Sequence, residues 1–433
     1  MERNLMRELV KWKNKRRRKP LIIRGARQVG KTWLMKEFGR RYYETVIYIS
    51  FDNNERMKQV FSIDMDIERI VNALQIEAGK KIGPENTLLI LDEIQEVPQA
   101  LTALKYFYED MPKYHIVAAG SLLGVALHAG TSFPVGKVDF LTLYPLTFKE
   151  FLEGTGEAAL AGLLESRDFV IITAFASKLA DLLRYYYYIG GMPEAVQTWI
   201  DTKDLNEVRD VQNSLLFYYA NDFSKHAPLE AVPRIQMVWQ SIPRQLAKEN
   251  RKFIYGLLRE GARAKDFELA IQWLADCGLI MKSTRISKPG MPLISYIEMN
   301  AFKLYLLDIG LLAAQGKMDA RVILEGQSIF EEFKGALTEQ FVAQELLAAG
   351  YDLYYYSKEN SSGELDFILQ IGGHIIPVEV KAEENLQAKS LREYCKKYGP
   401  DIAIRTSMSA YRMQEWMTNV PLYALSSYIA GIV

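Results

Sequence analysis

The sequence predicts an α/β protein whose N-terminal part is a parallel β-sheet covered by helices, followed by a mainly helical region and a smaller α+β region. Five short apolar runs between residues 21 and 143 alternate with helical patterns. This alternation is typical of a parallel sheet with both faces buried. The strand pattern stops near residue 147, and β-like runs return only after residue 277.

Each expected element of the N-terminal part follows from the spacing of its apolar residues. Short continuous apolar runs fit buried strands, which we place at residues 21–23, 45–51, 87–91, 115–119 and 137–143. Helical periodicity fills the intervals at residues 31–41, 54–79 and 99–110. Residues 1–19 fit a short amphipathic helix that runs into a basic segment.

The remaining chain predicts three further domains. Residues 147–251 have a helical pattern that is broken at Gly190-Gly191-Met192-Pro193, and a helix at 264–277 precedes two β-like runs. A helix followed by such a hairpin suggests a winged helix. A helix at 331–349 then precedes a β-rich segment. We expect a sheet core at residues 1–150, a helical lid at 151–232, a winged helix at 233–318 and an α+β domain at 319–433.

The composition fits a folded protein with several domains. Of the 433 residues, 49% are hydrophobic and 24% are charged, which argues against disorder. The 53 basic and 53 acidic side chains balance, so overall charge does not drive binding to nucleic acid or to a membrane. Two cysteines cannot form a cysteine-based zinc site. Without an apolar signal or membrane-spanning segment, we expect a cytoplasmic protein that does not bind membranes.

A glycine-rich segment after the first expected strand predicts a phosphate site. Residues 25–32, GARQVGKT, fit the pattern G-x-x-x-x-G-K-[ST] between a strand and a helix. The glycines let backbone N–H groups point inward, Lys31 reaches the β- and γ-phosphates, and the Thr32 hydroxyl binds Mg²⁺. The alternative is an ordinary glycine turn. The expected nucleotide-binding residues are Gly25, Gln28, Val29, Gly30, Lys31, Thr32 and Trp33.

Two carboxylates support the nucleotide interpretation. Asp92 and Glu93 end the third expected strand, where an acid beside a phosphate loop can hold Mg²⁺ through water. We assign that role to Asp92, and we expect Glu93 to orient or deprotonate the attacking water. Ser121 follows the fourth strand and is expected to sense the γ-phosphate, although it could equally cap a helix. No N-K-x-D sequence occurs, so ATP is preferred to GTP.

Seven segments together resemble a known family. They are GARQVGKT, LLILDEIQE, AAGSLLGVAL, SFPVGKVDFLTLYPLTFKEFL, GGMPEAV, SIPRQLAKEN and FKLYLLDIGLL. Their order is similar to that in bacterial and archaeal AAA-type ATPases with a restriction-endonuclease-like C-terminal domain of unknown function. The resemblance implies a P-loop core related to AAA+ and STAND ATPases, with ATP and Mg²⁺ as cofactors, then a lid and a winged helix. It also implies Pro193 as a nucleotide sensor and Lys137 as a charge-neutralising finger; a helix break and a solvated lysine are the alternatives.

The C-terminal segment permits a prediction of strand register. Gly372-Gly373 fits a two-residue hairpin turn, so Phe367 is expected opposite Val378. Extending this register places Asp366 opposite Glu379 and Glu364 opposite Lys381. The Cβ atoms of Asp366 and Glu379 would then lie about 5 Å apart.

Two carboxylates this close repel each other unless a cation neutralises them. The arrangement of Asp366, Glu379 and Lys381 resembles the PD-(D/E)XK nuclease core, in which the acids bind Mg²⁺ and the lysine positions water. Glu339 matches the helical acid of that family. A solvated surface ladder of charges is the alternative, and fold does not establish nuclease activity.

These features favour an ATP-hydrolysing switch coupled to a nuclease-like domain that engages nucleic acid. The alternative is a slow-hydrolysing, STAND-like signalling scaffold whose C-terminal domain is an inert binding module. Expected partners are ATP, DNA or RNA, and a second copy of the chain or another protein. Residues 11–19 contain seven basic residues, which fit either phosphate contacts or a solvated segment.

Overall fold

The computed structural model describes residues 1–121, 134, 136–248, 251–325, 331–358, 363–382 and 388–432. Parts of three quoted segments lie outside these ranges, at residues 122–127, at 132–133 with 135, and at 249–250. The chain forms two compact units. The first contains residues 2–144 and 276–278, and the second contains residues 145–275 and 279–433 together with Met1.

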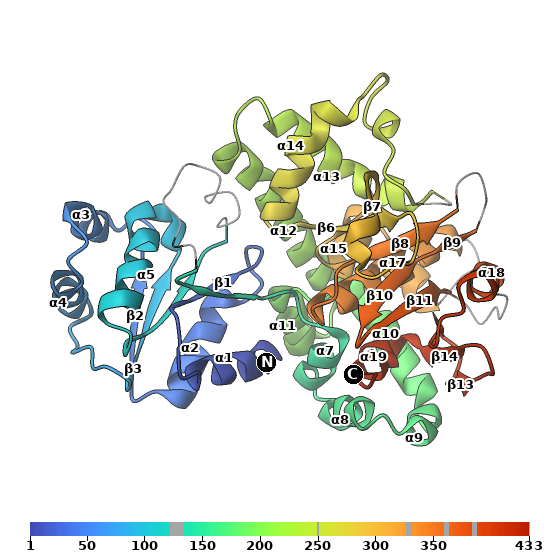
Figure 1. Ribbon diagram of the computed structural model, residues 1–433, viewed down its shortest axis with the longest axis horizontal. Helices are drawn as coiled ribbons and strands as arrows, with labels where there is room; N and C mark the ends of the chain where they lie inside the picture. The colour runs from blue at the N-terminus through green and yellow to red at the C-terminus, as the bar shows by residue number, and fades with distance from the viewer. Residues whose placement is uncertain are drawn as a thin grey trace. The chain divides into compact units, whose positions relative to one another are not determined.

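A five-stranded sheet forms the centre of the first unit (Figure 1). Its strands are β1 (Leu21–Arg24), β2 (Thr45–Ser50), β3 (Thr87–Asp92), β4 (His115–Ala119) and β5 (Asp139–Thr142). Their order is β2-β3-β4-β1-β5, and every pair is parallel. The predicted α/β core with a parallel sheet is therefore confirmed.

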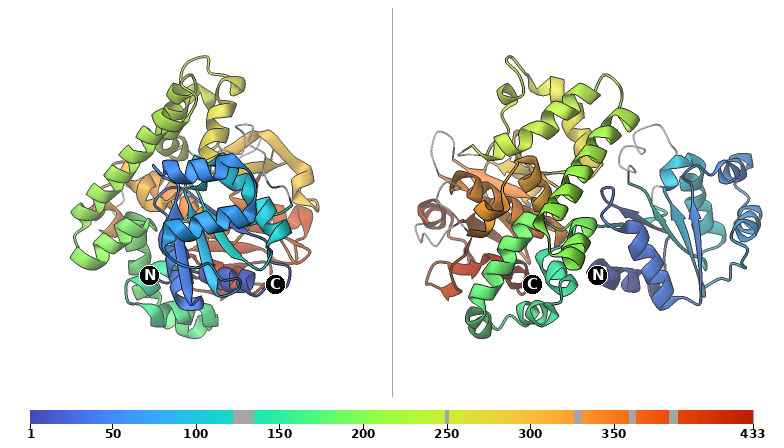
Figure 2. Two further views of the ribbon diagram at one scale, coloured as in Figure 1. Left: turned by 90° about the vertical axis from the view of Figure 1, so that its left-hand side faces the viewer. Right: turned by 180° about the vertical axis from the view of Figure 1, so that it is seen from behind.

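Helices cover this sheet, and Figure 2 shows them from two further sides. They are α1 (Leu5–Lys13), α2 (Lys31–Tyr42), α3 (Glu55–Ile63), α4 (Ile67–Ala78) and α5 (Pro98–Asp110). Side chains of α3, α4 and α5 pack with those of β2 and β3 in one apolar core, which includes Phe61, Leu74 and Leu104. All six residues of β3 are buried. This burial explains the continuous apolar run at residues 88–91.

The second unit begins with helices, as the sequence predicts for residues 147–251. They are α7 (Phe148–Gly154), α8 (Ala158–Ser166), α9 (Phe169–Ala174), α10 (Ala176–Ile189), α11 (Pro193–Thr202), α12 (Leu205–His226), α13 (Val232–Leu246) and α14 (Ala264–Asp276). The Gly-Gly break precedes α11, where the backbone N–H of Gly191 donates to Asp308 Oδ2 at 2.6 Å. Burial raises the pKa of Asp308 to about 6. Two of the quoted segments, GGMPEAV and FKLYLLDIGLL, therefore meet inside this unit.

Two sheets complete the second unit. The first joins β6 (Ile280–Ile286), β7 (Ile297–Leu306), β8 (Tyr354–Ser357) and β9 (Glu364–Leu365) in the order β7-β6-β8-β9. The second joins β10 (Phe367–Ile371), β11 (His374–Val380), β12 (Ile404–Ser407), β13 (Arg412–Met413) and β14 (Thr418–Pro421) in the order β10-β11-β12-β14-β13. Further helices are α15 (Ile309–Gln315), α16 (Ala320–Glu325), α17 (Glu331–Ala348), α18 (Lys389–Tyr398) and α19 (Leu425–Ile429).

The hairpin expected in the winged helix is part of a larger sheet. Strands β6 and β7 pair as predicted, but β6 also pairs in parallel with β8, which lies beyond residue 318. The predicted boundary between residues 318 and 319 thus separates strands of one sheet. A separate winged helix and the four domain bounds stay predictions.

Candidate functional site

The glycine-rich loop between β1 and α2 has the backbone that a phosphate-binding loop requires. Gly25 has a φ of +146° and Gly30, which precedes α2, has a φ of +94°. A Cβ atom at Gly25 would lie 2.2 Å from the carbonyl oxygen of Leu143, so a larger residue cannot take its place. Because α2 has twelve residues and begins at Lys31, its N-terminal dipole and free N–H groups face the end of this loop.

Lys31 is held inside the loop. Only 7% of this residue is exposed, and Nζ donates to the carbonyl oxygens of Gly25 at 2.9 Å and Ala26 at 2.8 Å. Burial lowers the pKa of Lys31 to about 8, against the opposing effect of Glu93 and Asp92. The ammonium group is thus largely charged at neutral pH. Phosphate oxygens can replace the two carbonyl oxygens as its hydrogen-bond acceptors.

The two predicted Mg²⁺ ligands lie together. Thr32 Oγ1 donates to Asp92 Oδ2 at 2.6 Å, and Tyr48 OH donates to the same oxygen at 3.0 Å. Hydroxyl and carboxylate oxygens are the ligands that Mg²⁺ prefers, so these residues fit the ion that the sequence motif implies. Burial, and then Asp92, raise the pKa of Tyr48 to about 12, which keeps its hydroxyl a donor.

Glu93 and Ser121, which follow the carboxyl ends of two strands, contact each other. Ser121 Oγ donates to Glu93 Oε2 at 3.3 Å, and Gln95 Nε2 donates to the same oxygen at 2.6 Å. Arg27 Nε donates to Ser121 Oγ at 3.3 Å. The carboxylate of Glu93 is therefore oriented by two donors while it remains only half-buried.

The sequence analysis did not identify Tyr48 or Gln95. Tyr48 lies on β2 and reaches Asp92 on the neighbouring β3. The order of strands in the sheet decides that contact, and the sequence alone does not fix it. Gln95 lies two residues after Glu93. Its polar side chain so close in sequence to the proposed base could have indicated that it contacts Glu93.

The other three nucleotide-site candidates have different surroundings. Trp33 follows the loop and is 44% exposed. Lys137 Nζ forms an ion pair with Glu109 at 2.8 Å, which fits the solvated-lysine alternative. Pro193 is the first residue of α11 in the second unit, where its fixed φ suits a helix start.

We expect Tyr48→Phe to weaken Mg²⁺-dependent nucleotide binding by about fivefold, because a net hydrogen bond contributes about 1 kcal/mol. Titrating Mg²⁺ at fixed nucleotide would measure this shift. Tyr43→Phe is the matched control, since the Tyr43 hydroxyl contacts His115 Nδ1 at 2.6 Å in the same unit. Equal Mg²⁺ curves for Tyr48→Phe and the unaltered chain would contradict the assigned role of Tyr48.

The predicted hairpin register in the second unit is correct over five residue pairs. Phe367 lies opposite Val378, and the ladder continues to Ile371 opposite His374. The extension to Glu364 and Lys381 is wrong. Glu364 pairs instead with Ser357 of β8, because the chain crosses from one sheet to the other at Asp366.

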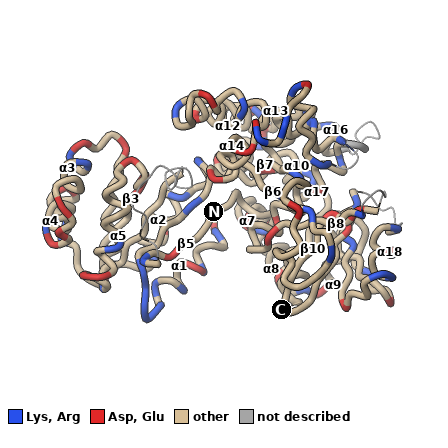
Figure 3. The backbone as a smooth tube through the Cα atoms, turned by 45° about the horizontal axis from the view of Figure 1, so that its top comes forward, with Lys and Arg blue, Asp and Glu red and all other residues tan. Residues whose placement is uncertain are grey.

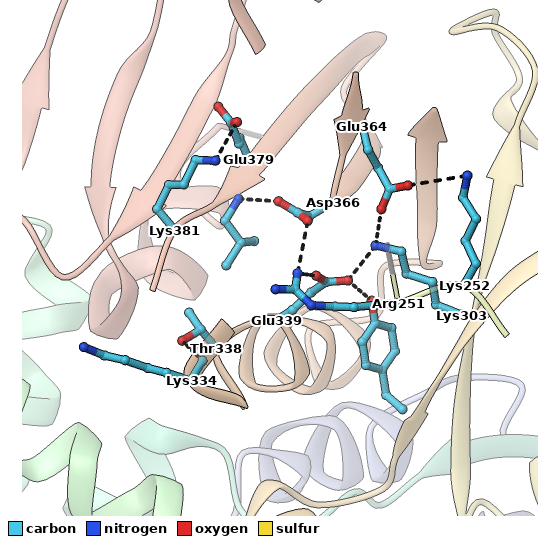
Figure 4. A network of polar contacts seen from close by, with 12 residues as sticks. Arg251, Lys252, Lys303, Lys334, Thr338, Glu339, Glu364, Asp366, Glu379 and Lys381 are labelled. Carbon is cyan, nitrogen blue, oxygen red and sulfur yellow. Dashed lines mark hydrogen bonds and ion pairs between the residues drawn. The ribbon is translucent and has the colours of Figure 1, made fainter. Parts of the chain in front are cut away.

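Four acids and four bases form a polar cluster where the two sheets meet α17 (Figure 4). The acids are Glu339, Glu364, Asp366 and Glu379, and the bases are Arg251, Lys252, Lys303 and Lys381. The predicted residues are thus neighbours, but they contact cations of the chain itself. Asp366 Oδ2 accepts from the backbone N–H of Val380 at 2.7 Å, and Lys381 Nζ lies 3.0 Å from Glu379 Oε1.

The surroundings in this cluster shift the pKa values of two of its acids in opposite directions. Burial, and then the charge of Glu339, raise the pKa of Asp366 to about 7. Burial also favours neutral Glu339, but Arg251 and Lys303 outweigh it and lower the pKa of Glu339 to about 2. Among the described residues, no three His, Cys, Asp or Glu side chains are grouped so that they could hold a metal ion. The predicted metal set of Glu339, Asp366 and Glu379 does not fit that role in this conformation.

Three family models match successive parts of the chain. Residues 17–152 match an AAA domain, residues 180–321 match a domain of unknown function, DUF8612, and residues 334–425 match another, DUF4143. None of the curated proteins matches the sequence. In the part of the chain that the structure describes, no helix has the length and apolar character needed to cross a membrane.

Several solved structures are similar to this chain at low sequence identity. A Walker-type ATPase of Pyrococcus abyssi is 15% identical, with 72% of this chain and 94% of that chain covered and a TM-score of 0.45. The ORC2 protein of Aeropyrum pernix in its ADP form is 14% identical, with 78% and 93% covered and a TM-score of 0.30. The ORC1 protein of Aeropyrum pernix in complex with DNA is 16% identical, with 78% and 92% covered and a TM-score of 0.26. The residues that match the AAA domain model, 17–152, include the glycine-rich loop and the five-stranded parallel sheet.

Proposed function

We propose that the first unit binds ATP with Mg²⁺ and hydrolyses it, and that this cycle acts as a switch on the second unit. The observation that carries the proposal is the single group of contacts that joins the glycine-rich loop to the end of β3. Lys31 lies inside the loop, Thr32 contacts Asp92, and Glu93 follows directly. The side chains proposed to bind phosphate, to hold Mg²⁺ and to activate water thus lie at one edge of the sheet.

Each residue has a defined role in the proposed reaction. Backbone N–H groups of the loop and the Lys31 ammonium bind the β- and γ-phosphates. Mg²⁺ held by Thr32 and, through water, by Asp92 would neutralise phosphate charge. Glu93 accepts a proton from the attacking water, and Ser121 orients the Glu93 carboxylate that it contacts. Phosphate release from ATP and from GTP, measured with Mg²⁺ and with EDTA, tests this assignment; hydrolysis should require Mg²⁺ and favour ATP.

We also propose that the second unit engages nucleic acid. Helix α18 supports this part, because Lys389, Arg392, Lys396 and Lys397 are all exposed on its ten residues. Figure 3 shows the blue of Lys and Arg along α18. The one acid on the helix, Glu393, forms an ion pair with Lys358 at 3.0 Å. A row of exposed cations is the feature that phosphate backbones attract.

Reversing two of these charges should weaken binding to labelled DNA or RNA by about tenfold and make it less dependent on salt. The variant is Arg392→Glu with Lys396→Glu, and fluorescence anisotropy at several salt concentrations measures the effect. Arg234→Glu with Arg244→Glu on α13 changes the charge of the same unit equally, since both residues are exposed. Equal losses in the two double variants would show that total charge matters rather than α18.

A further inference from the structure

Arg251 connects two carboxylates that come from different parts of the second unit. Its Nη1 atom contacts Glu339 Oε2 on α17 and lies 3.7 Å from Asp366 Oδ1, between β9 and β10. The side chain of Glu339 is fully buried, and that of Asp366 is 14% exposed. Figure 4 shows the guanidinium group between these two acids. The single positive charge of Arg251 thus lies against two acids and reduces their repulsion.

Lys303 has a different position in the same cluster. Its side chain is fully buried, and Nζ lies 2.8 Å from Glu339 Oε1 and 2.7 Å from Glu364 Oε1. The Arg251 side chain is 20% exposed, so it reaches the cluster from its rim. Of these two cations, Arg251 is therefore the one that solvent reaches.

The backbone of α17 makes room for the guanidinium. Gly335 lies one helical turn before Glu339, and a Cβ atom at this position would lie 2.4 Å from Arg251 Nη2. Any larger residue would push against the Arg251 side chain. The glycine at position 335 thus leaves the space beside Glu339 that the Arg251 guanidinium group occupies.

The two carboxylate oxygens of Glu379 have different surroundings among the described residues. Oε1 pairs with Lys381 at 3.0 Å, while Oε2 is buried and has no hydrogen-bond partner among the described residues. Buried carboxylate oxygens normally have a partner. The other two acids of the predicted metal set, Glu339 and Asp366, contact the guanidinium of Arg251 instead.

We propose that Arg251 takes the place of a divalent metal ion between Glu339 and Asp366, so that the native chain does not bind such an ion there. The cluster has four acids and four bases, and a divalent ion added to it would leave two uncompensated positive charges in a buried place. Removing the guanidinium leaves one negative charge in excess. Glu339 and Asp366, the two carboxylates that faced it, can then share a divalent ion.

Binding of Mn²⁺ to the full chain without nucleotide tests this proposal, with free Mn²⁺ followed by electron paramagnetic resonance. Arg251→Ala should bind one Mn²⁺ more than the unaltered chain, and Asp366→Asn in the same variant should remove that ion. In the unaltered chain, Asp366→Asn should change nothing. Binding by the unaltered chain that Asp366→Asn abolishes would overturn the proposal, as would a folded Arg251→Ala variant without the extra ion.

Two further variants control for charge and folding. Lys252→Ala removes the adjacent cation, which lies 3.8 Å from Glu364, and it should gain no ion; an equal gain would overturn the specific role of Arg251. Arg251→Gln keeps much of the side-chain volume and serves if Arg251→Ala does not fold. Mn²⁺ should raise the melting temperature of Arg251→Gln but not that of the unaltered chain, and equal shifts would contradict the proposal.

Discussion

Glu93→Gln is expected to slow ATP hydrolysis by about 100-fold or more while ATP still binds. Glutamine has nearly the same shape as glutamate and can still accept from Gln95 and Ser121, but it cannot take a proton from water. General-base catalysis contributes about 100- to 10,000-fold to such reactions. Single-turnover phosphate release measures the loss, and binding of a fluorescent ATP analogue measures what remains.

The matched control for this variant is Glu96→Gln. Glu96 lies three residues further along the chain and is exposed, so the same chemical change occurs outside the site. Its hydrolysis rate should equal that of the unaltered chain. If Glu93→Gln hydrolyses ATP as fast as Glu96→Gln, another group activates the water and the assignment of Glu93 is wrong.

Lys31→Ala is expected to weaken ATP binding by about 100-fold or more and to abolish measurable hydrolysis. A charge-assisted hydrogen bond contributes about 1.5–3 kcal/mol, and Lys31 can form such bonds to two phosphates. Tenfold in affinity corresponds to about 1.4 kcal/mol, so losing two bonds accounts for the expected change. Anisotropy of a labelled ATP analogue measures the affinity.

Loss of folding does not explain this expected result. Removing a buried ammonium group leaves only the Gly25 and Ala26 carbonyl groups to be hydrated, and it relieves the cost of burying a charge. Lys58→Ala, which breaks an ion pair with Glu55 on α3 at 2.8 Å, is the control within the same unit. Unchanged ATP affinity in Lys31→Ala would contradict the phosphate role of the loop.

The contacts around the glycine-rich loop could be anticipated because they follow from local rules, and their role in nucleotide binding stays a prediction. The glycine-rich loop has a fixed pattern, and carboxyl ends of parallel strands meet at one edge of a sheet. These two facts bring Thr32 to Asp92 and Ser121 to Glu93. The contact between Tyr48 and Asp92 depends on which strands are neighbours, so it could not be predicted from either segment.

The second unit shows where sequence reasoning stops. The Gly-Gly turn fixes the register of β10 and β11 because it is a short-range constraint. Glu364 and Leu365, which precede Asp366, pair with β8 rather than with β11. No pattern in the hairpin sequence indicates this change. Arg251 lies 88 residues before Glu339, so only the folded chain reveals that it occupies the acidic cluster.

Calorimetric titration of the unaltered chain with a non-hydrolysable ATP analogue tests the central claim most directly. The account predicts one binding event per chain, tighter with Mg²⁺ than with EDTA, and absent in Lys31→Ala. Binding that is absent in the unaltered chain at millimolar nucleotide, or that is equally strong in Lys31→Ala, would contradict it.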